Sequence, residues 1–100
     1  MSHQPVRMIM GDGSRFFGDF PETCWWEDVR DWVTTIPGAV LTGYVTDHVL
    51  EAWIDFTYRG HQFSINNQYE SYWFFVDDPD CPDEILASVL DLWAPLFERT

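Results

Sequence analysis

The sequence predicts an α+β domain: a single antiparallel sheet, a four- to five-stranded meander, with an N-terminal and a C-terminal amphipathic helix packed on one face. Three observations predict it. Apolar residues recur at helical spacing in 23–36 and again in 80–97, and they alternate with polar residues in 39–76. Connections within 39–76 are short, which forces neighbouring strands to run antiparallel. With 100 residues, the common size of one domain, we expect a single domain over 1–100.

The first segment, 1–20, predicts a hairpin or an edge strand. A short apolar run, Val6 to Met10, precedes the turn signal Gly11-Asp12-Gly13, and Phe16 and Phe17 follow. The first ten residues lack the basic and apolar character of a signal peptide. We therefore expect a cytoplasmic protein.

A first helix is expected over 23–36. Thr23 is a candidate N-cap, because its hydroxyl could accept a hydrogen bond from a free backbone amide of the first turn. The pair Pro37-Gly38 predicts the end of the helix. The apolar stripe of this helix consists of Trp25, Val29, Trp32, Val33 and Ile36.

Four strand-like runs follow in 39–76. Their expected turns are Asp47-His48, Arg59-Gly60 and Asn67-Gln68. In the second run, alternation places Leu50, Ala52, Ile54, Phe56 and Tyr58 towards the helices. The fourth run, Tyr69 to Val76, directs either Tyr72, Phe74 and Val76 or Trp73 and Phe75 inwards. Either choice leaves large aromatic side chains on the outer face.

The last helix is expected over 80–97. It follows the carboxylate-rich stretch 77–84, and carboxylates favour the positive end of a helix. Asp80 is the candidate N-cap with Asp83 as its partner in the first turn, and Pro95 should end or bend the helix. A calcium loop is the sharper alternative, but the stretch lacks the alternating oxygen ligands and central glycine of an EF-hand.

Cys24 and Cys81 are too few for a disulfide framework and lack metal-ligand spacing. The favoured interpretation is two small apolar residues beneath helix ends. A Cys24–Cys81 disulfide and thiols with pKa values lowered by the helix dipole are the alternatives.

Charge excludes several classes of function. The chain has no lysine, and its five arginines face seventeen Asp and Glu, giving a net charge of −12. With 46% apolar and 18% aromatic residues it is nevertheless a folded domain and not a disordered acidic tail. Binding to nucleic-acid phosphates or to anionic membranes needs basic patches, so we expect neither.

The residues offer little for catalysis, so we expect neither an enzyme nor a cofactor or metal. His3, His48 and His61 accompany no nucleophile motif, and no phosphate-binding loop is present. Glu51 and Asp55 share one strand face about 13 Å apart. That exceeds the separation of about 5–9.5 Å between paired catalytic acids of glycosidases. A small-molecule pocket lined by Trp25, Trp32 and Trp93 is a further alternative, although their helical spacing favours core packing.

The outer sheet face is therefore the predicted binding surface. Exposed aromatics of this size mark contact surfaces, and surrounding acids would steer a basic partner. The predicted partner-binding residues are Glu51, Trp53, Asp55, Gln62, Ser64, Asn66 and Trp73.

These residues favour a non-enzymatic inhibitor or immunity-type protein that neutralises a basic toxin or nuclease. One alternative is a nucleic-acid mimic that blocks a DNA- or RNA-binding protein, as in phage counter-defence. Another is a protein that self-associates as a homodimer through the open sheet face.

Overall fold

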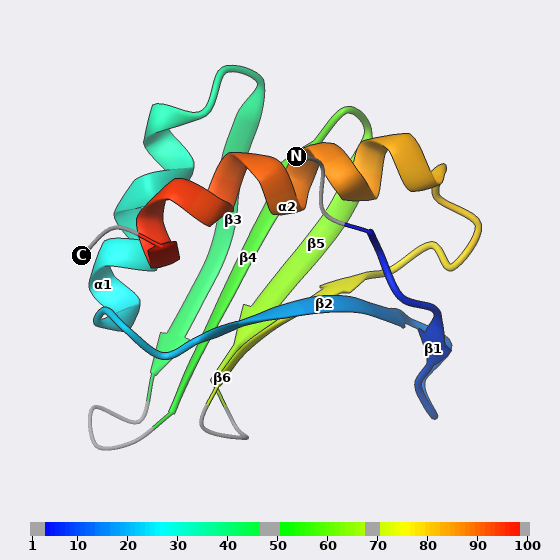
Figure 1. Cartoon of the computed structure of the whole chain (residues 1–100), viewed down its shortest axis with the longest axis horizontal. Helices are drawn as coiled ribbons and strands as arrows, with labels where there is room; N and C mark the ends of the chain where they lie inside the picture. The colour runs from blue at the N-terminus through cyan, green and yellow to red at the C-terminus, as the bar shows by residue number, and fades with distance from the viewer. Residues whose placement is uncertain (1–3, 47–50, 68–70, 99–100) are drawn as a thin grey trace.

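The computed structural model describes residues 4–46, 51–67 and 71–98. Its strands form one antiparallel sheet in the order β1-β2-β6-β5-β4-β3 (Figure 1). The strands are β1 (Met8–Ile9), β2 (Arg15–Pro21), β3 (Ala39–Thr46), β4 (Ala52–Tyr58), β5 (His61–Asn66) and β6 (Ser71–Val76). The described part of the chain thus has six strands where four to five were predicted, because the N-terminal segment forms a hairpin and contributes two.

That hairpin joins the sheet through its second strand. β2 pairs with β6, so Phe16 lies opposite Phe75 on the outer face. A bulge between Phe16 and Gly18 then turns Phe17 into the core, where it is fully buried. Gly18 leaves room for the last helix, since a Cβ there would lie 2.8 Å from Leu90 Cδ2.

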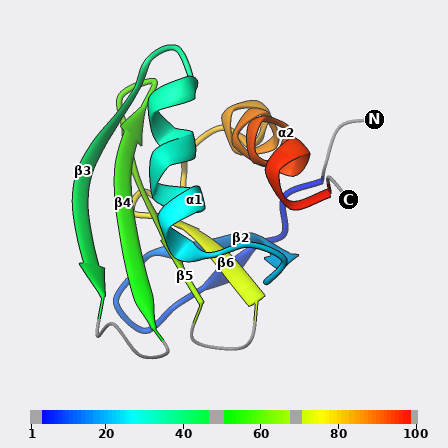
Figure 2. The same ribbon diagram turned by 90° about the vertical axis from the view of Figure 1, so that its left-hand side faces the viewer.

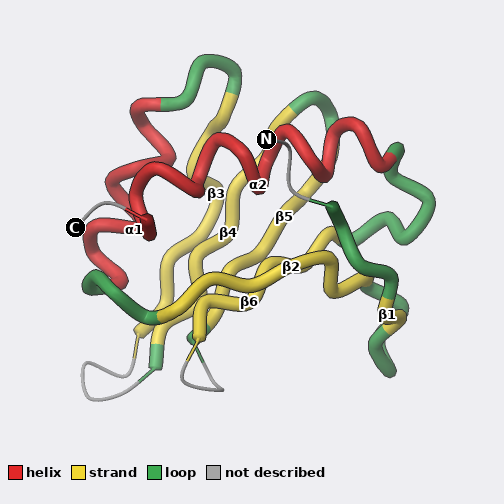
Figure 3. Tube along the Cα trace, in the orientation of Figure 1, coloured by secondary structure: helices red, strands yellow, loops and turns green. Residues whose placement is uncertain are grey.

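Two helices cover one face of the sheet, and the other face is left open (Figures 2 and 3). α1 spans Trp26–Trp32 and continues as the short 3-10 helix η1 (Val33–Thr35). The prediction of a start at Thr23 was wrong. Trp25 is the N-cap and makes no side-chain capping bond, whereas the Thr23 hydroxyl donates to the Phe97 carbonyl at 3.0 Å.

This later start also changes which tryptophan is buried. Trp25, predicted to lie on the apolar stripe, is 66% exposed, and its neighbour Trp26 is buried in its place. Trp93 is fully buried and stacks on Phe56 with ring centroids 4.6 Å apart. Trp25 and Trp93 therefore do not line a common pocket between sheet and helices.

The second helix, α2, spans Asp83–Glu98. It starts three residues later than Asp80, the predicted N-cap. The Asp80 amide donates instead to Asp78 Oδ1 at 2.9 Å, within the preceding turn. The helix continues through Pro95 to Glu98. None of the described helices is long and apolar enough to cross a membrane.

The meander follows the predicted alternation where it is described. Arg59 and Gly60 form the two-residue turn between β4 and β5, with positive φ angles of 51° and 80°. Leu50, the turn Asp47-His48 and Gln68 lie outside the described residues. The strand positions that face the helices are buried: Ala52, Ile54, Phe56, Tyr58, Phe63, Ile65, Tyr72, Phe74 and Val76. The open choice for β6 is thereby settled, and Trp73 and Phe75 face outwards.

Cys24 and Cys81 form no disulfide, so the alternative of a Cys24–Cys81 disulfide is not realised. Cys81 is buried in the core beside the start of α2. Burial raises the pKa of its thiol to about 11, with the charge of Asp78 adding to the effect. For Cys81, therefore, the alternative of a pKa lowered by a helix dipole is wrong.

Candidate functional site on the open sheet face

The pairing of β4, β5 and β6 brings outward-facing side chains into rows across the open face. Trp53, Asn66 and Trp73 form one row. Asp55, Ser64 and Phe75 form the next. The middle member of each row belongs to β5 and is small, while its neighbours on β4 and β6 are large or charged. This contrast in size creates a trough along β5.

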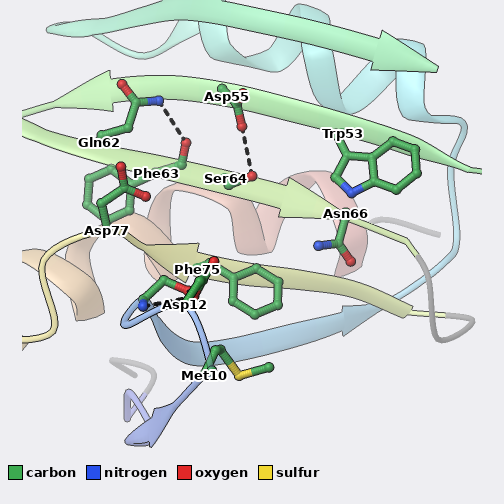
Figure 4. Close-up of a pocket in the computed structure, with 12 residues that line it drawn as sticks. Met10, Asp12, Trp53, Asp55, Gln62, Phe63, Ser64, Asn66, Phe75 and Asp77 are labelled. Atoms are coloured by element: carbon green, nitrogen blue, oxygen red, sulfur yellow. Dashed lines mark hydrogen bonds between the residues drawn. The ribbon is translucent and has the colours of Figure 1, made fainter.

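A hollow of about 500 Å³ occupies this trough. Figure 4 shows Trp53 on β4 and Phe75 on β6 lying on either side of Ser64 and Asn66. The hollow is lined by Met10, Gly11, Asp12, Ser14, Trp53, Asp55, Gln62, Phe63, Ser64, Asn66, Phe75 and Asp77.

The turn between β1 and β2 supplies one wall of the hollow. The backbone amide of Met10 donates a hydrogen bond to the Ser14 carbonyl at 2.8 Å, and this bond closes the turn. Asp12 Oδ1 accepts from the Ser14 amide at 3.0 Å and from its hydroxyl at 2.6 Å. These hydrogen bonds lower the pKa of Asp12 and hold its carboxylate ionised in a defined position.

Asp55 is fixed between two neighbours. Its Oδ1 accepts a 2.7 Å hydrogen bond from the Ser64 hydroxyl. On its other side lies Gly43, where a Cβ would stand 3.0 Å from Asp55 Oδ2. A larger residue at Gly43 would therefore push the carboxylate out of place. Local pairing thus positions a charged group at the edge of the hollow.

Asp77 follows β6 at the end of the trough, where its amide donates to the Gln62 carbonyl at 3.0 Å. Its pKa is raised above the usual value, first by desolvation and then by the negative charges of Asp55 and Asp12. The three carboxylates therefore share one region of negative potential. Within the described ranges, none of the three forms an ion pair.

The arginines that the structure describes are engaged elsewhere. Arg7 approaches Asp80 at 3.9 Å, and Arg15 and Arg30 pair with Asp83 and Asp31 at 3.0 and 2.9 Å. Arg59 lies over the ring of Tyr58, with its Cζ 5.5 Å from the ring centroid. The described part of the chain accordingly supplies no cation to neutralise the hollow.

Five of the predicted partner-binding residues line this hollow: Trp53, Asp55, Gln62, Ser64 and Asn66. Asn66 is only 8% exposed and forms part of the floor. Gln62 donates from Nε2 to Thr42 Oγ1 at 3.0 Å, and this hydrogen bond links β5 to β3 across β4.

Glu51 and Trp73 do not line the hollow. Glu51 precedes β4 and is half-buried, and its backbone carbonyl accepts a 2.9 Å hydrogen bond from Thr46. Trp73 lies next to the hollow and packs on Phe16 with ring centroids 4.5 Å apart. Phe16 also contacts Phe75 at 5.9 Å, so an aromatic cluster supports that wall of the hollow.

The other seven lining residues were not among the predicted binding residues: Met10, Gly11, Asp12, Ser14, Phe63, Phe75 and Asp77. The alternation in β6 already indicated that Phe75 could face outwards. Met10 and Asp12 come from a turn that reaches the site only because β2 pairs with β6, and no local pattern specifies that pairing.

Outside the hollow, His61 lies near one acid of the stretch 77–84. His61 Nδ1 lies 4.0 Å from Asp78 Oδ2. Among the residues described, no group of three or more His, Cys, Asp or Glu side chains could hold a metal ion. Neither a known family model, nor a curated protein, nor a solved structure matches this chain.

Proposed function

We propose that this protein is a non-enzymatic binding module, of the inhibitor or immunity type, that captures a basic protein partner on its open sheet face. The observation that carries the proposal is the hollow over β5. It combines exposed aromatic surface with three carboxylates that lack a counter-ion within the described chain.

Trp53 and the carboxylates around it suit this face to binding a basic partner. Half-buried Trp53 can lose its remaining exposure in a complex, and tryptophan is a frequent anchor of protein interfaces. The carboxylates would attract a cationic surface and speed its association. A net charge of −12 would at the same time repel most other proteins and nucleic acids.

The experiment has two stages. The partner is first isolated on the immobilised protein from the native cell, and its binding to purified variants is then measured by surface plasmon resonance. Trp53→Ala should weaken binding by about 2 kcal/mol, a thirtyfold rise in Kd. Asp55→Arg should also weaken binding, because it reverses a charge that attracts the cationic partner. The matched control is Trp25→Ala, an exposed tryptophan at the start of α1 on the helix side.

Other outcomes identify the alternatives. A partner whose affinity collapses with moderate salt, and which tolerates Trp53→Ala, would indicate a nucleic-acid mimic and contradict the aromatic anchor. A stable homodimer in sedimentation, with Trp53 protected from quenching in the dimer, would indicate self-association through this face.

A further inference from the structure

The hollow over β5 has the chemistry of a receptor for one side chain of the partner. This inference rests on the proposed function and makes it more specific. The hollow has aromatic walls, an uncharged polar floor and three carboxylates around it. Its volume of about 500 Å³ falls within the range of about 300–1,000 Å³ typical of ligand pockets.

We propose that the hollow receives an arginine side chain of the partner, with the guanidinium between the carboxylates of Asp55 and Asp77 and the aromatic walls formed by Trp53 and Phe75. Asp55 is the directional acceptor, because Ser64 and Gly43 fix its carboxylate. Asp77 is the carboxylate whose ionisation is opposed in the free protein, first by desolvation and then by the charges of Asp55 and Asp12.

Arginine fits these walls better than lysine does. A guanidinium is planar, stacks on aromatic rings and presents a fork of donors to carboxylates. An ammonium group is compact and strongly hydrated, and it makes no stacking contact. The half-buried faces of Trp53 and Phe75 therefore favour a flat cation.

In the free protein, none of the described arginines forms an ion pair with the carboxylates of this negatively charged region. Asp12 is kept ionised by Ser14, whereas desolvation and then the charges of Asp55 and Asp12 oppose the ionisation of Asp77. A cation in the hollow would offset these negative charges. Binding should consequently lower the pKa of Asp77 and release a proton at acidic pH.

The test uses the full chain and a defined probe, Nα-acetyl-arginine amide, in an NMR titration that follows the indole N–H of Trp53. The citrulline analogue has nearly the same shape as the arginine probe but no charge. The lysine analogue has the positive charge but no planar guanidinium group. We expect the arginine probe to shift the Trp53 signal and the citrulline probe to bind about tenfold more weakly or not at all.

Two variants locate the probe. Asp55→Asn and Asp77→Asn should each weaken binding of the arginine probe several-fold. The control Asp28→Asn, in the first turn of α1 on the helix side, should not. Equal shifts with the citrulline probe, no shift with the arginine probe, or unchanged binding in both hollow variants would overturn the inference.

The partner-binding measurement separates the two proposals. If the arginine probe does not bind in the hollow but the partner still requires Trp53, the inference of an arginine site is wrong and the proposed function stands. If the partner also binds the Trp53→Ala variant normally, the surface assigned to the function is wrong as well.

Discussion

Ser64 on β5 and Asp55 on β4 are direct partners across the open face of the sheet, and the Ser64 hydroxyl donates a 2.7 Å hydrogen bond to Asp55 Oδ1. Both side chains are half-buried, so the bond is partly shielded from water. Hydrogen bonds to charged groups in such settings are among the stronger ones. The pair therefore links the stability of the sheet to the geometry of the hollow.

Removing this bond has a measurable consequence for folding. Ser64→Ala should lower the free energy of unfolding by about 1 kcal/mol, and the effect should be absent in an Asp55→Ala background. Urea denaturation of the four proteins of the double-mutant cycle measures the coupling. If the two single effects simply add, the hydrogen bond contributes nothing to stability and Asp55 is not fixed by Ser64.

Asp77 gives a prediction with a defined pH dependence. Because its pKa is raised in the folded protein, the fold holds the Asp77 proton more tightly than the unfolded chain does. Ionisation therefore opposes folding, and this cost is present above the folded pKa and absent below the ordinary value of 3.8.

Asp77→Asn removes that cost, so the variant should be more stable than the parent protein at pH 7. The gain should shrink as the pH falls and vanish below about pH 3.8, where both proteins are uncharged at this site. Urea midpoints across this range measure it. Asp28→Asn provides the contrast, because it removes a favourable charge from the start of α1 and should slightly destabilise the protein.

The sequence predicts those parts of the fold that depend on local rules. Alternation identified the buried and exposed faces of β4 and β5, and Arg59-Gly60 has the length and glycine of the tight turn that the structure contains. The predicted residues that line the hollow come from this same alternation.

The features that the sequence did not predict have two causes, which are competition between neighbouring residues and pairing between distant strands. Trp25 and Trp26 are adjacent and equally apolar, so periodicity alone could not tell which one the core would take. Thr23 could cap a helix in isolation, but in the fold its hydroxyl meets the Phe97 carbonyl. Met10 and Asp12 reach the hollow through the β2–β6 pairing, which joins distant segments of the chain.

Cys81 should be almost inert towards thiol reagents in the native protein. The thiolate is the reactive form, and a pKa of about 11 leaves about a thousandth of the thiol ionised at pH 8. Its burial also blocks access. Titration with a chromogenic disulfide reagent should show Cys81 reacting only after unfolding, and Cys81→Ser identifies the slow signal. Rapid modification of Cys81 without loss of structure would contradict its position in the core.

The last prediction concerns Arg15, whose side chain is 3% exposed, and Asp83, whose side chain is 72% exposed. Arg15 donates from Nε and Nη2 to the Val6 carbonyl at 3.0 and 2.8 Å, and from Nη1 to Asp83 Oδ1 at 3.0 Å. It thus fastens the N-terminal segment to the start of α2. The two ends of this ion pair differ in what their removal leaves behind.

Asp83→Ala leaves a buried guanidinium without its counter-ion, whereas Arg15→Met leaves an exposed carboxylate that water can solvate. Asp83→Ala should therefore cost about 2 kcal/mol of unfolding free energy, and Arg15→Met less. Glu84→Ala is the matched control, because Glu84 is also an acid of the first turn of α2 and makes no ion pair with Arg15. Urea denaturation measures all three, and a larger cost for Arg15→Met than for Asp83→Ala would show that the tether to Val6, and not the burial of the charge, controls stability here.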